Sequence, residues 1–294
     1  MGVYNVNGNP LLAVYDAQGN ELDYAYDVEG NLIYTRLPSD DDNDDPYISG
    51  RTLIFEDKFE TINTNNWGFE LGRVRNSELQ YYTNNGNNVE ITQDKELCIT
   101  AKRENYVNAN WTSASLTSFG KKEFTYGRLE AKIKFPKVAG AFPAFWTLGT
   151  QLVLQYYADG TWMTHASGNW PYCGENDIVE HFAGGTDQVT CGAYYSETDE
   201  QGVGKVSMGR EYTNVDMSEY HIYAVEWTAT SMTYYLDGVQ WSQFDITDAM
   251  AQSFRESHYI LLNLAVGAVG GSPADSTNEM KMYVDWVRVY APLT

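Results

Sequence analysis

Basic residues are scarce in this 294-residue sequence. It contains 19 Lys and Arg against 40 Asp and Glu, which gives a formal net charge of −21 at pH 7. Nucleic-acid binding depends on Lys and Arg contacts with phosphates, and anionic membrane surfaces attract basic segments. The composition therefore argues against nucleic acid and anionic membranes as partners. It favours a neutral substrate or none, with the excess negative charge serving solubility.

Cysteine and long apolar runs are also scarce. The three cysteines, Cys98, Cys173 and Cys191, are too few for a disulfide scaffold, and their odd number leaves at least one thiol unpaired within the chain. No apolar run is long enough to cross a bilayer, so we expect no membrane insertion. Residues 1–15 lack the basic n-region and the long apolar h-region of a secretory signal, so no signal peptide is expected in this chain.

Helical periodicity is rare, and residues 50–294 instead contain many short runs in which apolar and polar residues alternate. These runs lie at 96–104, 127–136, 219–228, 231–241, 259–267 and 281–290. The pair Asp237-Gly238 within one of them is a strong signal for a β-hairpin turn. Only residues 245–254 are expected to form a short helix. The pattern predicts an all-β domain, a β-jelly-roll sandwich over residues 50–294.

The first 36 residues contain a repeat with a period of 11 residues. Tyr4, Tyr15 and Tyr26 recur at this interval, and each is followed four residues later by a Gly-Asn pair. A Gly-Asn pair between two short strands is typical of a β-hairpin, so residues 1–36 are expected to form a small β-hairpin repeat module. Such units bury little surface alone. They resemble the Y-D-x-x-G-N units of bacterial and phage-tail-like surface proteins, and we expect them to mediate attachment or self-association.

Residues 37–49 differ in composition from the segments on either side. Five Asp and one Asn lie between Pro38 and Pro46. Repulsion between these charges predicts an extended, solvated linker between the repeat module and the main domain. A calcium-binding loop is not expected here, because the glycine and the closing glutamate of an EF-hand are absent.

The stretch GENDIVEHF, residues 174–182, places three carboxylates within six residues at Glu175, Asp177 and Glu180. Side chains alternate along a strand, so Glu175 and Asp177 would share one face and Glu180 would point the other way. A β-bulge between Asp177 and Glu180 would return Glu180 to their face. A charged edge strand is the alternative, but the apolar residues around the acids favour a functional cluster.

Carboxylates that share one face repel each other, so at least one of them is expected to keep its proton. Retaining glycoside hydrolysis requires this division of roles. One carboxylate attacks the anomeric carbon as an anion, and the other protonates the leaving oxygen and later activates water. A third acid can hydrogen-bond the nucleophile. The four histidines show no spacing typical of metal ligands, so no catalytic metal is expected.

Several segments in order resemble glycoside hydrolase family 16, the laminarinase and β-glucanase family. The family signature E-[aliphatic]-D-x-x-E is matched by ENDIVE, with Asn176 at the aliphatic position. The segments NSELQYYT (76–83), GAFPAFWTLG (140–149), NWPYCGE (169–175) and VDWVRVYAP (284–292) are similar to other family blocks. The resemblance covers about residues 51–292 and implies a jelly roll with a concave substrate cleft.

The same resemblance implies residue roles and a substrate. Glu175 matches the nucleophile, Asp177 the assisting acid and Glu180 the acid/base. The expected activity is endo-hydrolysis of β-1,3-glucan, with mixed-linkage β-1,3-1,4-glucan as a second substrate, and it needs no cofactor for catalysis. Three alternatives stay open: cleavage of another polysaccharide such as a galactan, transglycosylation, and glucan binding without catalysis. The substrate class suggests an extracellular or cell-surface location.

Family positions that line the glucan cleft are matched by Asn76, Trp146, Trp170, Phe142 and Tyr194. For Trp146, core packing is as good an interpretation as substrate contact. Phe142 stands where many members have tryptophan, and Tyr194 lies in a strand that replaces a histidine-containing one, so substrate choice stays open. Asp285 matches a ligand of the structural calcium that many members hold on the convex face.

Overall fold

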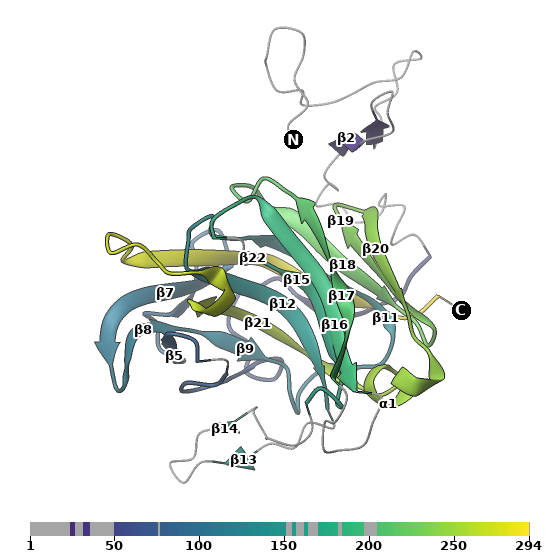
Figure 1. The fold of residues 1–294 in the computed structure, drawn as a ribbon, viewed down its shortest axis with the longest axis horizontal. Helices are drawn as coiled ribbons and strands as arrows, with labels where there is room; N and C mark the ends of the chain where they lie inside the picture. The colour runs from purple at the N-terminus through teal and green to yellow at the C-terminus, as the bar shows by residue number, and fades with distance from the viewer. Residues whose placement is uncertain are drawn as a thin grey trace, which may run out of the picture.

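The computed structural model describes residues 24–26, 32–35, 50–75, 77–150, 155–156, 162–163, 170–181, 184–196 and 205–293. Over these residues the chain consists mainly of β-strands, most of which belong to two twisted sheets packed face to face (Figure 1). The predicted all-β sandwich is therefore confirmed.

The first sheet has eight strands and carries the acidic stretch on β15 (Glu175–Glu180). Its order is β17 (Lys205–Asn214), β16 (Gln188–Ser196), β15, β12 (Ala141–Gly149), β21 (His258–Val266), β9 (Ser115–Thr117) and β4 (Gly68–Phe69), with β10 (Glu123–Phe124) also paired to β21. All of these pairings are antiparallel. The acidic strand is thus an interior strand, with β16 on one side and β12 on the other.

The second sheet has ten strands and covers the opposite side of the core. Its order is β20 (Val239–Asp245), β19 (Ser231–Leu236), β18 (His221–Trp227), β11 (Gly127–Lys134), β22 (Glu279–Tyr290), β7 (Leu97–Tyr106), β8 (Ala109–Ser113) and β5 (Gln80–Tyr82), while β3 (Leu53–Asp57) pairs with β22 and β6 (Val89–Ile91) with β7. Each run that the sequence predicts as a strand lies on a strand of one of the two sheets.

Short elements complete the described chain. In the third repeat, β1 (Tyr24–Tyr26) pairs antiparallel with β2 (Leu32–Thr35), which agrees with the expected pair of short strands. The first two repeats and the linker lie outside the described residues. The other short elements are β13 (Gln155–Tyr156), β14 (Trp162–Met163), the 3-10 helices η1 (Asp248–Met250) and η2 (Ala268–Gly270), and the helix α1 (Ala251–Phe254).

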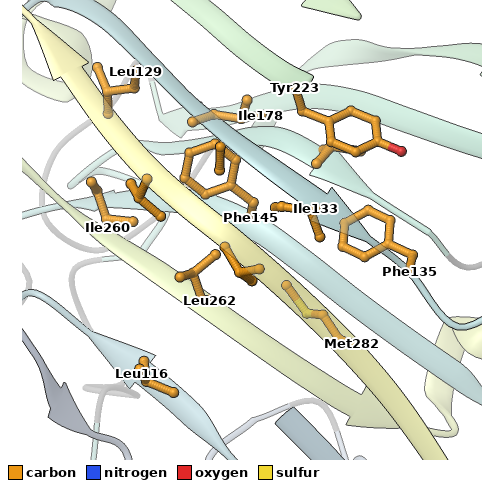
Figure 2. Close-up of a cluster of buried hydrophobic side chains, with 14 of the residues drawn as sticks. Leu116, Leu129, Ile133, Phe135, Phe145, Ile178, Tyr223, Ile260, Leu262 and Met282 are labelled. Carbon is orange, nitrogen blue, oxygen red and sulfur yellow. The ribbon is translucent and has the colours of Figure 1, made fainter. Parts of the chain in front are cut away.

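One hydrophobic core fills the space between the sheets (Figure 2). Phe145, Ile178 and Leu262 enter it from the first sheet, and Ile133 and Met282 enter it from the second. These side chains are 0–1% exposed, and complete burial of such a residue stabilises the fold by roughly 1.5–3 kcal/mol. The core thus holds the inner side of β15 in a fixed place.

Two local predictions are also confirmed. Asp237 and Gly238 form the turn between β19 and β20, with φ angles of 49° and 76° that this type of tight turn requires. The predicted short helix appears as η1 followed by α1, which spans four residues. Within the described residues, no helix is long and apolar enough to span a membrane. The three cysteines are all buried, and no disulfide joins them.

Candidate active site

A β-bulge interrupts β15 between Asp177 and Glu180. Asp177 lies opposite Gly192 of β16 and Glu180 lies opposite Thr190, so two residues of β15 span a single residue of β16. The pairing of β15 with β12 shifts at the same place. The bulge that the three-residue gap predicts is therefore confirmed.

The bulge brings the three carboxylates to one face of the sheet. On β12 the partner of Glu175 is Leu148, the partner of Asp177 is Trp146 and the partner of Glu180 is Ala144. These partners alternate along β12 with core residues such as Phe145, and directly paired residues project to the same face. The acids therefore all lie on the face of the first sheet that points away from the core, which we call the acid-bearing face.

The three carboxylates are not a solvated charged surface. Asp177 is 2% exposed and Glu180 is 7% exposed, while Glu175 is half-buried. Burial of a charge is costly unless neighbouring groups compensate it or a proton neutralises it. The charged edge-strand alternative is wrong, because β15 is an interior strand and its acids are withdrawn from water.

The polar residue at the aliphatic position of the signature has a partner inside the core. Asn176 is 1% exposed and faces the second sheet, where the hydroxyl of Tyr234 donates a hydrogen bond to Asn176 Oδ1 over 2.6 Å. Tyr234 is itself 0% exposed. This bond satisfies the buried amide oxygen and ties the acidic strand to β19.

Trp170 borders the first glutamate. It lies in the turn that leads into β15, and its indole Nε1 donates a hydrogen bond to Glu175 Oε2 over 2.8 Å. The Trp170 ring centroid is 5.8 Å from that of Tyr194, which is the partner of Glu175 on β16. Two aromatic rings therefore stand beside Glu175.

An apolar cluster forms the floor around the acids. Its buried members are Ala144, Trp146, Leu148, Cys173, Tyr259 and Leu261, with Phe119 and Trp170 packed against them. Burial raises the pKa of the Cys173 thiol to about 12, and the nearby Glu175 carboxylate acts in the same direction. Burial likewise raises the pKa of Tyr259 well above its usual value, so both groups stay neutral near pH 7.

A polar network adjoins this floor. The Arg75 guanidinium pairs with Glu70 over 2.5 Å and lies 4.9 Å above the Trp146 ring. Trp146 Nε1 donates to Asn263 Oδ1 over 2.6 Å, and Asn263 Nδ2 donates to the Tyr82 hydroxyl over 3.1 Å. The indole of Trp146 is therefore held on one side by a cation and at its edge by an amide.

The structure places four of the five expected substrate-binding residues on or beside the acid-bearing face. Trp170 and Tyr194 adjoin Glu175, and Phe142 is half-buried on β12 on the same side as Trp146. Trp146 is 6% exposed and its N–H is used by Asn263, which favours a supporting role. Asn76 lies outside the described residues.

The sequence-based prediction did not include the polar network. Glu70 and Arg75 are charged residues in a loop, which gives no sign of burial, although Arg75 reaches the acid-bearing face through its contact with Trp146. Asn263 offered the one useful signal, because it is a polar residue inside the apolar run 259–267. An interruption of that kind in a buried strand indicates a side chain with a specific partner.

Asp285, the expected calcium ligand, lies on β22 in the second sheet. Its Oδ2 is 2.8 Å from Lys132 Nζ, so an ammonium group already neutralises this carboxylate. Among the described residues there is no group of three or more His, Cys, Asp or Glu side chains that could hold a metal ion. The described side chains do not test a calcium at Asp285, and the structural calcium stays a prediction.

Buried carboxylates beside aromatic rings, on the outer face of a jelly-roll sheet, are typical of enzymes that cleave polysaccharides. The fold and the site thus define a glycoside hydrolase. Comparison with known protein families identifies the glycoside hydrolase family. Residues 76–288 match the model of glycosyl hydrolases family 16, and the chain belongs to this family.

Similar proteins agree with this assignment. A β-glucanase of Rhodothermus marinus is 29% identical over 253 residues, which cover 81% of this chain and 84% of that protein. The α subunit of clotting factor G of Tachypleus tridentatus is 32% identical over 81% of this chain, which spans only 34% of that longer protein. The crystal structure of the laminarinase catalytic domain of Thermotoga maritima superimposes with a TM-score of 0.68 at 27% identity, covering 83% of this chain and 99% of that one.

The N-terminal repeats match a separate family. Residues 4–38 match the model of the RHS repeat. The match covers the three 11-residue units and ends just inside the acidic segment.

Proposed function

We propose that this chain is a retaining endo-acting β-glucanase that cleaves β-1,3-glucan, with mixed-linkage β-1,3-1,4-glucan as a second substrate. The observation that carries the proposal is the bulge in β15, which places Glu175, Asp177 and Glu180 on one face. Family membership and the likeness to a β-glucanase and a laminarinase support the substrate class.

In the proposed mechanism Glu175 attacks the anomeric carbon while Glu180 protonates the glycosidic oxygen. The bond to the leaving sugar breaks, and Glu175 holds the remaining sugar as a covalent intermediate. Glu180, now an anion, takes a proton from water, which attacks the anomeric carbon and releases Glu175. Asp177 lies on the same face between the two glutamates, where it can hydrogen-bond the nucleophile.

The different surroundings of the two glutamates support this division of roles. Glu175 is half-buried and accepts a hydrogen bond from Trp170, which favours the charged form that a nucleophile needs. Glu180 is 7% exposed, and burial favours the neutral form that an acid needs.

The substitution Glu175→Gln tests the assignment of the nucleophile. We expect kcat on laminarin to fall by at least about 10³-fold, because an amide cannot form the glycosyl ester. Folding and glucan affinity should persist, which circular dichroism and affinity electrophoresis would check. Glu90, an exposed glutamate on β6, gives the matched control, and Glu90→Gln should leave turnover unchanged. Near-normal turnover by Glu175→Gln would overturn the proposal.

A substrate panel separates the alternatives. The protein is incubated with laminarin, lichenan, agarose, carrageenan and xyloglucan, and the products are resolved by chromatography. We expect a ladder of oligosaccharides from laminarin and a smaller yield from lichenan. Release from agarose or carrageenan alone would favour a galactan, products longer than the starting oligosaccharide would favour transglycosylation, and binding without products would favour a non-catalytic glucan-binding protein.

The repeats and the location of the protein belong to the same proposal. A polymeric glucan does not enter a cell intact, so the enzyme would meet its substrate outside the cell or at a cell surface. The N-terminal repeats, which match the RHS repeat, would then attach the catalytic domain or join copies of the chain. Size-exclusion chromatography of the full chain and of residues 47–294 would test self-association, and equal apparent subunit numbers would contradict it.

A further inference from the structure

A strip of exposed apolar side chains lies outside the acid-bearing face, and no step of the proposed mechanism uses it. Tyr81 is half-buried, and the other members are 39–79% exposed: Leu79, Tyr106, Val107 and Val269. Neighbouring exposed apolar side chains mark a binding surface more often than single ones do. We infer that this strip, the outer track, binds a glucan chain where it extends beyond the active site. The inference rests on the proposed function, which supplies the glucan.

The outer track begins beside the acid-bearing face. Phe142 of that face packs against the loop that contains η2, where a Cβ atom placed on Gly270 would lie 3.2 Å from Phe142 Cβ. At the start of the same loop, a Cβ atom on Gly267 would lie 2.7 Å from Leu79 Cγ. The loop therefore connects the acid-bearing face with Leu79, and it exposes Val269 between these two contacts.

From Leu79 the outer track continues along β5. Buried and more exposed side chains alternate over residues 78–82, with Leu79 and Tyr81 on the outer side. The buried side belongs to the candidate site, because the Tyr82 hydroxyl accepts the hydrogen bond from Asn263 in the polar network. One short strand thus supports the site with one side and presents the outer track with the other.

Two tyrosines form the far end of the outer track. The ring centroids of Tyr81 and Tyr106 are 5.2 Å apart, with an interplanar angle of 62°. Arg73 holds their two segments together, since its guanidinium donates to Asn108 O over 3.0 Å and to Glu78 O over 2.7 Å. Figure 1 shows β5 and the hairpin of β7 and β8 together at one end of the sandwich. A tyrosine offers a sugar both an apolar ring and a hydroxyl for hydrogen bonding.

Val107, at the tip of this hairpin, has a strained backbone. It is the first residue of the two-residue turn between β7 and β8, and its φ is +50°. A β-branched residue rarely adopts a positive φ, and glycine is favoured at such turn positions. The fold nevertheless keeps an apolar side chain there that is 79% exposed. Strain of this kind is typical of functional positions, and a ligand of Val107 would account for it.

The charge of the chain favours a neutral polymer over a second copy as the occupant of the outer track. Two copies that each carry a net charge of −21 repel each other, whereas a glucan carries no charge. A long glucan can contact the acid-bearing face and the tyrosines at the same time. Binding at two connected places raises the affinity for a long chain and not for a short ligand that reaches only one place.

The test measures glucan binding by the Glu175→Gln protein, which is expected to leave the glucan intact. Addition of Tyr106→Ser should weaken its affinity for laminarin by about five- to tenfold and leave its affinity for the trisaccharide laminaritriose unchanged. Addition of Val107→Gly should weaken the affinity for laminarin by about two- to threefold. Its melting temperature should stay level or rise, because glycine adopts a positive φ without strain. Titration calorimetry and thermal melting provide these measurements.

Ile54→Ser is the matched control, because Ile54 is 51% exposed on β3 and lies outside the outer track. It should change neither affinity. Unchanged laminarin affinity in the Tyr106→Ser protein would overturn the inference. A change confined to the apparent subunit number in size-exclusion chromatography would also overturn it, because the strip would then join copies of the chain. If the Glu175→Gln protein cleaves laminarin or fails to bind it, the proposed function itself fails, so the two failures are distinguishable.

Discussion

Asn176 has a polar side chain at a position where the family signature has an aliphatic one. The strand directs it into the core, where an amide without a partner costs roughly 1–3 kcal/mol. The bond from Tyr234 removes that cost and joins the two sheets directly behind the carboxylates. The departure from the signature is thus compensated by a residue 58 positions away along the chain, which sequence periodicity alone does not connect to it.

His258 is a buried histidine whose hydrogen-bond partners show which ring nitrogen carries the hydrogen. Nε2 lies 2.7 Å from the carbonyl oxygen of Ser253, which only accepts, so Nε2 carries the hydrogen. Nδ1 lies 3.0 Å from Thr147 Oγ1 and accepts from that hydroxyl. Burial lowers the pKa of His258 to about 4, and the bond to Ser253 opposes this only in part.

His258 makes the stability of the protein depend on pH. The folded pKa of about 4 lies below the ordinary value of 6.5, so the unfolded chain binds the proton more readily between these two values. His258 therefore does not lower the free energy of unfolding above pH 6.5. As the pH falls from 6.5 towards 4, protonation of the unfolded chain lowers this free energy by about 3 kcal/mol in total. Urea denaturation at several pH values would measure it. His258→Gln should flatten this part of the curve, and an unchanged slope would contradict the assignment.

Within β15, the bulge decides where the last glutamate points. A regular strand alternates its side chains, so a spacing of three between Asp177 and Glu180 would direct Glu180 into the core. The extra residue restores the outward direction, and both Ile178 and Val179 become core residues. The strand therefore buries two apolar side chains in succession and still presents three acids on the other face.

Deleting or inserting one residue in β15 tests the role of the bulge separately from the role of the three acidic residue types. Deletion of Val179 restores a regular register in which Glu180 still lies opposite Ala144, so we expect a folded and weakened enzyme that retains measurable turnover. The lost core side chain should cost roughly 2–4 kcal/mol of stability. Insertion of one alanine after Val179 should abolish turnover, because it turns Glu180 inward if the bulge is kept and moves Glu180 two residues beyond Ala144 along β12 if the strand becomes regular. The measurements are kcat on laminarin and thermal melting, and equal loss in both proteins would contradict the argument.

At the scale of the whole molecule, the described part of the candidate site lies within residues 50–294. The described neighbours of the three acids come from residues between 119 and 261. We expect deletion of residues 1–46 to change kcat on soluble laminarin by less than about twofold, because a domain with its own core folds alone. A large loss of kcat would show that the repeats shape the site. The intact chain is the control, assayed at the same molar concentration.

Net charge is a second property of the whole molecule. With a net charge of −21 the chain repels other anions and repels itself. The described surface counters this with ion pairs such as Lys132 with Asp285 and Arg288 with Glu56 on the second sheet. The acid-bearing face carries three carboxylates on β15, so the candidate site suits a neutral polymer such as a glucan better than a sulfated or uronic polysaccharide.

Some features of this protein follow from local sequence alone. Alternation of apolar and polar residues predicts the strands, Asp237-Gly238 predicts a hairpin, and the gap between Asp177 and Glu180 predicts the bulge. Each depends on neighbouring residues only, because strand alternation and turn geometry are properties of a few consecutive peptide units. The candidate chemistry of the three acids also follows from local sequence, because six consecutive residues contain all three acids at their characteristic spacing.

Other features required the tertiary structure. The Arg75–Glu70 pair, the bond from Tyr234 to Asn176 and the contact of Trp170 with Glu175 depend on how loops and sheets pack, and packing is a property of the whole chain. Exposure is decided there as well: the three acids of the candidate site are partly or fully withdrawn from water because β15 is an interior strand. The sequence by itself determined the reactive groups and their common face. The fold decided the environment of each group, because solvent exclusion and hydrogen-bond partners come from residues far apart in the chain.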